Sequence, residues 1–146
     1  MTTEHEKWAV VSHPEFDDWL EALEPTSQEK VAALIRLLRQ HGPNLGRPYA
    51  DRIRGSRFKN LKELRPTSRA DEALRVLYYF DKRRNGVLLV GGDKAGNWSR
   101  WYVENIPVAE HRIDEHLLQL ADAKKQVEAR KRTTRPRRTK TGRRRK

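Results

Sequence analysis

The fold of this chain is decided by residues 74–92, LRVLYYFDKRRNGVLLVGG. Two apolar runs flank the polar turn from Lys82 to Asn85, a pattern that indicates antiparallel strands. Residues 61–65 form another strand candidate, so the sequence predicts a meander of three strands over 61–65, 73–81 and 86–92. Because side chains alternate along a strand, one face is expected to meet helices and the other to carry Arg75 beside a tyrosine.

Two helices are predicted before this meander. Residues 7–11 form a short strand candidate, and Ser12 followed by Glu15 resembles a capping box that opens a helix. Pro25 breaks that helix, and a second one follows with the same apolar spacing until Gly42. Both helices have one apolar stripe, so we expect them to pack side by side.

A third helix is predicted after the meander. Residues 44–59 indicate an irregular basic connector, whereas apolar residues from Pro107 onward recur on one side of a helix up to Leu120. The sequence therefore predicts an α+β domain over residues 1–120, an antiparallel β-sheet with an N-terminal helical pair packed on it and a C-terminal helix. Residues 121–146 are expected to form a basic, flexible tail that is helix-compatible to Arg132.

Composition excludes several kinds of site. The chain has no cysteine, which removes disulfides, thiolate nucleophiles and cysteine-based zinc sites. A length of 146 residues suits one modest core. No apolar run approaches the roughly 18 residues needed to cross a bilayer, and the N-terminus has no apolar signal core. We therefore expect a cytoplasmic protein without a membrane association.

The net charge of +12 is unevenly distributed. Residues 121–146 hold 13 Lys/Arg against two acids, a balance of +11, whereas residues 1–120 hold 19 against 18. Within the body, residues 36–100 carry 16 basic and 6 acidic residues, a balance of +10. Phosphate chemistry is therefore expected in this middle part.

The predicted strands carry cations that suit RNA cleavage: Lys59, Lys62, Arg65, Arg75 and Lys94. Transesterification needs a base for the 2′-hydroxyl, cations for the charge on the scissile phosphate, and an acid for the leaving 5′-oxygen. A lysine serves as base only if its pKa falls, and Arg65 and Arg75 would lower it by repulsion. Spacing alone equally allows a solvated cationic face or a surface that faces a protein partner.

Other motifs do not indicate a cofactor. His111 and His116 are five residues apart and do not form a natural metal pair on a helix. Gly91-Gly92 lacks the lysine-serine/threonine ending of a phosphate loop. Trp98 and Trp101 suit either base stacking or packing. No metal, nucleotide or other cofactor is expected.

Three ordered blocks resemble a known family: residues 63–65 (ELR), 74–81 (LRVLYYFD) and 87–94 (VLLVGGDK). Their order and spacing are similar to the RelE/ParE superfamily, specifically its phage-derived HigB-like branch, and the resemblance covers roughly residues 7–120. It implies a RelE-like, microbial RNase-like fold. It also implies the toxin of a type II toxin-antitoxin system, a ribosome-dependent mRNA endoribonuclease that works by metal-independent transesterification. The implied partners are the ribosome, mRNA and a helix-turn-helix (XRE-like) antitoxin.

The resemblance also assigns roles to individual residues. Arg75 matches the strand arginine for the scissile phosphate, and Arg65 and Lys94 match basic positions that contact phosphate or stabilise its charge. Lys62 is the candidate base, with Lys59 as the alternative, because a one-residue slip exchanges the faces of this strand. Three residues compete for the C-terminal position of a proton donor or stacking group: Tyr102, Trp101 and His116. Replacement of Arg75 by alanine is expected to abolish toxicity in a folded domain.

Two other functions remain open on the same fold. One is a ParE-like toxin that poisons DNA gyrase, for which the basic sheet is a docking surface. The other is an inactive module that binds nucleic acid or a partner. For the tail, nonspecific attachment to RNA competes with improved solubility or no role. Deletion of residues 121–146 is predicted to weaken ribosome association at low salt and to leave cleavage detectable.

Overall fold

A five-stranded sheet organises the first part of the chain, as seen in a computed structural model that describes residues 7–144, with side chains through Thr133. The strands are β1 (Val10–Ser12), β2 (Ala50–Arg52), β3 (Lys62–Leu64), β4 (Leu74–Phe80) and β5 (Gly86–Asp93). Their order in the sheet is β1-β5-β4-β3-β2, with β1 parallel to β5 and the other pairs antiparallel. The predicted meander is β3-β4-β5, so the α+β class and the central strands are confirmed.

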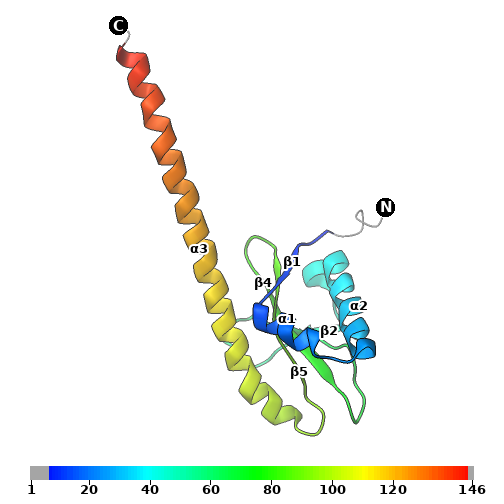
Figure 1. Ribbon diagram of the computed structural model, residues 1–146. Coiled ribbons are helices and arrows are strands. Elements are labelled where there is room, and N and C mark those ends of the chain that lie inside the picture. Colours follow the sequence, from blue (N-terminus) through cyan, green and yellow to red (C-terminus); the bar gives the residue numbers. More distant parts are fainter. Residues whose placement is uncertain (1–6, 145–146) are drawn as a thin grey trace. The chain divides into compact units, whose positions relative to one another are not determined.

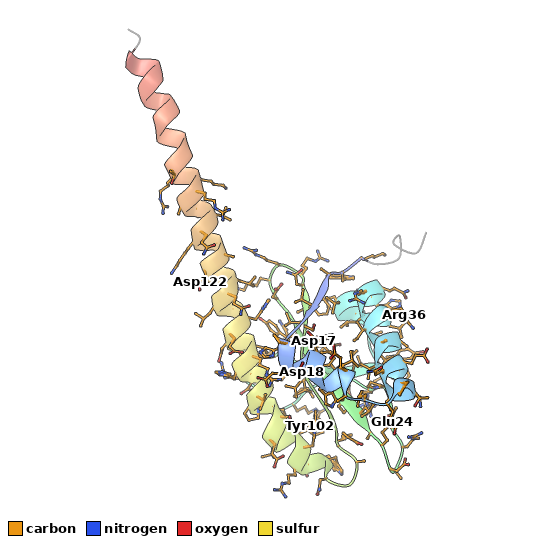
Figure 2. The ribbon with its side chains drawn as sticks, viewed as in Figure 1. Asp17, Asp18, Glu24, Arg36, Tyr102 and Asp122 are labelled. Carbon is orange, nitrogen blue, oxygen red and sulfur yellow. The ribbon has the colours of Figure 1, made fainter. Side chains whose placement is uncertain are left out.

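Two helices, α1 (Pro14–Glu21) and α2 (Pro25–His41), lie on one side of the sheet (Figure 1). A short 3₁₀ turn, η2 (Gly42–Asn44), follows α2. Phe16 of α1 and Leu38 of α2 pack in one cluster with Val76 and Tyr78 of β4. The acidic residues of α1 face solvent, including Asp17 and Asp18 (Figure 2). The apolar side of each helix is therefore the side that covers the sheet.

The first part of α3 (Trp98–Arg144) packs against the opposite face of the sheet. Ala109 and Ile113 are fully buried there with Leu77 of β4 and Leu89 of β5. The alternate residues of β4 are thus covered as well, and the face that carries Arg75 is a second core rather than an open surface. Burial on both faces explains why β4 and β5 are long, nearly continuous apolar runs.

Two helix starts differ from the sequence prediction. The N-cap of α1 is His13, whose Nδ1 accepts a hydrogen bond from the backbone N–H of Glu15, because Ser12 is still paired to β5. The helix α3 begins at Trp98 and not near Pro107, which lies inside it. The apolar periodicity alone places the start near Pro107, but packing of the preceding turns outweighs the backbone donor that this proline removes.

The described chain divides into two compact units, one that ends at Ile113 and one that begins at Asp114. This boundary lies before the predicted one at residue 120, because the last buried apolar side chain of α3 is Ile113. The helix continues through Arg144, beyond the predicted limit at Arg132. Flexibility of the tail stays a prediction. Over the described part of the chain, neither α3 nor any other helix combines the length and apolar character that a bilayer crossing requires.

Candidate active site

Four of the five predicted site residues converge on a glutamate that the sequence analysis did not select. Glu63 of β3 lies opposite Leu77, on the face of the sheet that also carries Arg75. Arg65 follows β3 on the same face, Lys94 follows β5, and Tyr102 lies in the first turns of α3 (Figure 2). These residues define the Glu63 cluster: Glu63, Arg65, Arg75, Lys94 and Tyr102.

The carboxylate of Glu63 is the centre of the cluster and is only 6% exposed. Tyr102 Oη donates a 2.6 Å hydrogen bond to Glu63 Oε1. The Nε atoms of Arg75 and Arg65 lie 3.8 Å from Oε1 and 4.0 Å from Oε2, respectively. A buried carboxylate is costly without partners, so these contacts, the Tyr102 hydrogen bond above all, stabilise Glu63.

Arg75 is the most buried member of the cluster, with an exposed fraction of 1%. Its Nη1 donates to the carbonyl oxygens of Thr67 (2.6 Å) and Leu74 (2.7 Å), and its Nη2 donates to Ser68 Oγ (3.2 Å). The distal guanidinium nitrogens therefore hold the turn before β4 in place. Only Nε is directed at Glu63, and it makes no hydrogen bond. The Nε of Arg65 is buried in the same way.

Lys94 has the environment that the sequence analysis expected for a catalytic lysine. Its Nζ lies 5.3 Å from the ring centroid of Tyr102 and 5.6 Å from that of Trp98. Burial holds the pKa of Lys94 below its usual value, repulsion from Arg75 and Arg65 lowers that pKa further, and Glu63 partly offsets the effect. The predicted lowering of a lysine pKa by two arginines therefore occurs at Lys94.

Lys62, the predicted base, lies on the other face of β3. Its Nζ donates a 2.9 Å hydrogen bond to the carbonyl oxygen of Pro43. Burial lowers the pKa of Lys62, and repulsion from Arg52 adds to that, without a contribution from the Glu63 cluster. Neighbouring residues of a strand face opposite ways, so Glu63 occupies the position that Lys62 was expected to fill. The alternative base, Lys59, lines a separate pocket together with Lys62.

The three candidates for the C-terminal position are separated by their contacts. Tyr102 belongs to the cluster, and its pKa is raised by burial and by the hydrogen bond to Glu63, so its hydroxyl is protonated at neutral pH. Trp101 packs on Gly92, where a Cβ atom would lie 2.3 Å from Trp101 Nε1. His116 belongs to the second compact unit and is not placed relative to the cluster. Of the three, Tyr102 is therefore the one that contacts the other predicted site residues.

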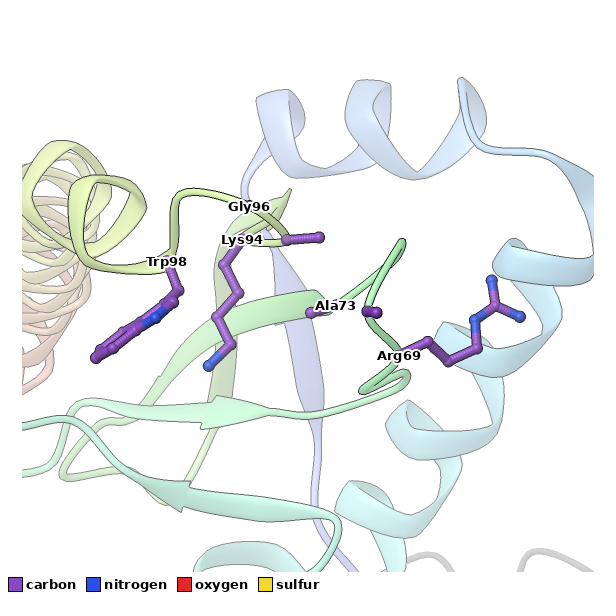
Figure 3. Close-up of a pocket in the computed structure, with 7 residues that line it drawn as sticks. Arg69, Ala73, Lys94, Gly96 and Trp98 are labelled. Carbon is purple, nitrogen blue, oxygen red and sulfur yellow. The ribbon is translucent and has the colours of Figure 1, made fainter.

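A groove of about 320 Å³ continues from the cluster, with Lys94 as the shared residue (Figure 3). Arg69 and the indole of Trp98 also line it, and Trp98 is 62% exposed. The exposed ring of Trp98 beside Lys94 suits a stacked base with its phosphate, whereas Arg69 is paired with Asp71 and Glu72. Among the residues whose side chains are described, no three His, Cys, Asp or Glu side chains gather as metal ligands.

Glu63 is the residue that the sequence reasoning missed. It is the first residue of the block ELR at residues 63–65, which contributes to the family resemblance as a whole. A signal was available, because residues 63 and 65 of one strand face the same way and an acid among so many cations is unusual. Which residues of β4 lie opposite Glu63, by contrast, follows only from the register of β3 against β4.

Comparisons with known proteins show the family of the chain. The family model described as phage-derived protein Gp49-like matches residues 18–114. A candidate toxin of Mycobacterium tuberculosis, HigB3, is 46% identical over 109 residues, which cover 75% of this chain and 93% of that protein. A second candidate toxin of that organism, HigB2, is 44% identical over 113 residues, which cover 77% of this chain and 56% of that protein. The chain therefore spans about half the length of HigB2.

The fold is similar to a solved structure. In the crystal structure of the archaeal RelE-RelB complex from Pyrococcus horikoshii OT3, one chain superposes with a TM-score of 0.50 and 15% sequence identity. The match covers 62% of this chain and 98% of that chain. At this identity the likeness concerns the fold, and it agrees with the predicted RelE-like architecture.

Proposed function

The chain belongs to the family of phage-derived Gp49-like proteins, the HigB-like branch of the RelE/ParE superfamily, and on this premise we propose that it is a toxin that cleaves mRNA on the ribosome. The names of the two mycobacterial relatives support a toxin. The single observation that carries the chemistry is the Glu63 cluster, in which two arginines and a protonated tyrosine meet at one carboxylate and a lysine lies near the tyrosine ring.

The cluster offers a group for each step of transesterification. Neutral Lys94 takes the proton of the 2′-hydroxyl as O2′ bonds to phosphorus. Arg65 and Arg75 stabilise the negative charge that develops on the phosphate oxygens. The bond from phosphorus to O5′ breaks, and O5′ takes the proton of Tyr102. The products are a 2′,3′-cyclic phosphate and a 5′-hydroxyl end.

The described conformation is closed toward a substrate. Arg75 is 1% exposed, and the hydroxyl of Tyr102 is hydrogen-bonded to Glu63. We infer that a phosphate reaches the arginines only after this hydrogen bond breaks, which also frees the Tyr102 proton for the leaving oxygen. The buried Nε donors of Arg65 and Arg75, which lack a hydrogen bond, are the groups that would gain most from a phosphate oxygen.

The test is cleavage of a defined mRNA on purified ribosomes, with the ends of the products analysed. We expect 5′-hydroxyl and 2′,3′-cyclic phosphate ends, and no cleavage where the scissile nucleotide carries a 2′-O-methyl group. The variant Arg65→Gln/Lys94→Gln should lose activity. The matched control Lys82→Gln/Arg83→Gln removes the same charge from the exposed turn between β4 and β5 and should retain it.

Two outcomes would contradict this function. Products with 5′-phosphate ends would exclude attack by the 2′-hydroxyl. Growth arrest with intact mRNA and DNA damage would select the gyrase alternative. The RelE-RelB pairing of the similar structure supports an antitoxin as partner. We propose that this antitoxin is of the helix-turn-helix type, as the family resemblance implies. Co-purification of this chain with the product of a neighbouring helix-turn-helix gene, and loss of toxicity on co-expression, would test it.

A further inference from the structure

A second basic site lies at the β2 edge of the sheet, next to strand β3 that carries Glu63. It is a pocket of about 720 Å³ that is lined by nine residues, none of which belongs to the Glu63 cluster. Arg52, Arg54, Lys59 and Lys62 contribute four of the lining side chains. Lys62 faces away from Glu63 because the two residues are neighbours on β3. The pocket therefore shares no residue with the Glu63 cluster, although Asp51 in its lining is the register partner of Glu63.

The one acid in this pocket is already neutralised. Asp51 Oδ2 accepts hydrogen bonds from Arg47 Nη2 (2.6 Å) and Arg47 Nε (3.1 Å), and its Oδ1 accepts one from the backbone N–H of Arg52 (2.8 Å). These contacts hold the pKa of Asp51 below its usual value. The charges of Asp51 and Arg47 cancel each other. The charges of the four other cations that line the pocket are therefore not compensated by an acid of the lining.

Three of these four cations lack an acidic partner among the described side chains, whereas Lys62 donates to the carbonyl oxygen of Pro43. Within the part of the chain whose side chains are described, Arg52, Arg54 and Lys59 have no carboxylate within ion-pair distance, and all three are exposed. Repulsion from Arg52 contributes to the lowered pKa of Lys62. An anion in the pocket would relieve this repulsion, so the arrangement favours a ligand with several negative charges.

The lining also indicates what kind of anion fits. Ile53 is the only apolar residue among the nine, and no aromatic ring lines the pocket. Base stacking and apolar anchoring are therefore absent from its described lining, whereas guanidinium groups match phosphate oxygens in fork geometry. An acidic peptide would normally bring apolar anchors as well.

We propose that this pocket binds the phosphate backbone of an RNA strand, independently of its base sequence. This inference rests on the proposed function, which identifies RNA as the ligand that carries the phosphate groups. It adds a second RNA contact at the β2 edge, so that the substrate or ribosomal RNA is held at two places on the domain. Binding here does not require cleavage at the Glu63 cluster.

The test measures binding of the full chain to a fluorescein-labelled 2′-O-methyl oligoribonucleotide by anisotropy at several salt concentrations. This probe cannot be cleaved by its own 2′-oxygen. The pocket variant is Arg52→Gln/Arg54→Gln/Lys59→Gln. The control variant, Lys30→Gln/Arg36→Gln/Lys82→Gln, removes equal charge from exposed positions on α2 and the β4-β5 turn, and Figure 2 shows Arg36 on α2.

We expect the pocket variant to bind about tenfold more weakly and its plot of log K against log salt to flatten by about 2, as for three lost phosphate contacts. The control should stay within about twofold of the parent chain. Equal losses in both variants would overturn the proposal, because nonspecific charge would then explain them. Loss of binding to a polyglutamate peptide without loss of RNA binding would overturn it in favour of a protein partner.

A measurement on the unmodified chain guards against misfolding of the variants. Bound RNA should protect Lys59 from an amine-reactive reagent, read by mass spectrometry, and should leave Lys82 reactive. Equal reactivity of the two lysines would overturn the proposal. The outcomes are separable from the proposed function, because absent cleavage with intact pocket binding rejects only the active site, whereas cleavage without pocket protection rejects only this site.

Discussion

Tyr102 Oη donates a 2.6 Å hydrogen bond to Glu63 Oε1 and so connects the start of α3 to the central strand β3. The two residues are 39 positions apart in the sequence, and both are withdrawn from solvent in part or in full. The bond keeps the tyrosine protonated and the carboxylate partnered. In the closed conformation the bond therefore stabilises the buried carboxylate. In the proposed open conformation the bond is broken, and Tyr102 supplies its proton to the leaving oxygen.

Replacement Tyr102→Phe should separate these two contributions. The ring and its packing stay, but the buried Glu63 loses its shortest contact, which should cost about 1–3 kcal/mol of unfolding free energy. Cleavage should also fall, because the leaving oxygen loses its proton donor. Urea unfolding and the ribosome assay measure the two effects. Tyr49→Phe at a 45% exposed position is the control, and unchanged cleavage in Tyr102→Phe would exclude Tyr102 as the acid.

The burial of Arg75 changes what its replacement is expected to do. The variant Arg75→Ala would leave two carbonyl oxygens and the Glu63 carboxylate without their cationic partner, which should cost about 3–5 kcal/mol. Loss of toxicity would then reflect unfolding, contrary to the sequence-based expectation of a folded inactive domain. Circular dichroism and urea unfolding test this, and a melting temperature close to that of the parent chain would contradict it.

Arg65 gives the cleaner test of charge stabilisation. Its side chain is 26% exposed, and its Nε lies 4.0 Å from Glu63 without a hydrogen bond. Arg65→Gln should therefore lower the cleavage rate about 10²-fold, which is the usual effect of losing one preorganised hydrogen-bond donor to a developing charge. The free energy of unfolding should change little. Single-turnover cleavage at saturating ribosome concentration measures the rate. A rate equal to that of the Lys82→Gln control would remove Arg65 from the site.

Gly92 should accept no side chain, because a Cβ atom there would lie 2.3 Å from Trp101 Nε1. Gly92→Ala is expected to cost about 1–3 kcal/mol through overpacking and to displace the turn that carries Tyr102. The double variant Gly92→Ala/Trp101→Phe offers a smaller ring and should recover part of the stability. Equal unfolding midpoints for Gly92→Ala and the parent chain would contradict the close approach.

The sequence could predict the central strands because both hydrophobic patterning and turn chemistry agree at residues 74–92. Through the family resemblance it could also predict that Arg65, Arg75 and Lys94 lie in one cluster. It could not determine on which face of the sheet Lys62 lies. A shift of the side-chain alternation by one residue reverses the face, and the pattern of residues 61–65 fits either alternation.

The burial of the site was equally hidden from the sequence. Arg75 lies in a strand whose alternate residues all become covered, and the covering element is the start of α3. Trp98, Ser99 and Arg100 open that helix as polar or exposed residues, and Pro107 interrupts its pattern. Local propensity thus assigned the helix start about two turns too late, and with it the position of Tyr102.

Lys94 makes the sharpest prediction about pH. Its pKa in the folded state is lowered by burial and by Arg75 and Arg65, so its neutral form accumulates at a lower pH than for a free lysine with a pKa of 10.5. If Lys94 is the base, the cleavage rate should rise with pH through that lowered pKa. Lys94→Arg keeps the charge but stays protonated, so the rise should disappear while RNA binding persists.

The same group predicts a stability change of defined sign. In the unfolded chain Lys94 holds its proton up to its ordinary pKa of 10.5, whereas the folded chain releases it at lower pH. The unfolded state therefore binds more protons between the two values, and the contribution of Lys94 to stability rises with pH across that window. Lys94→Gln should lack this rise, which urea unfolding of both proteins at pH 7 and near pH 10 would measure. A parallel pH dependence of the two proteins would show that the pKa of Lys94 is not lowered on folding, and the base would then have to be sought in Glu63.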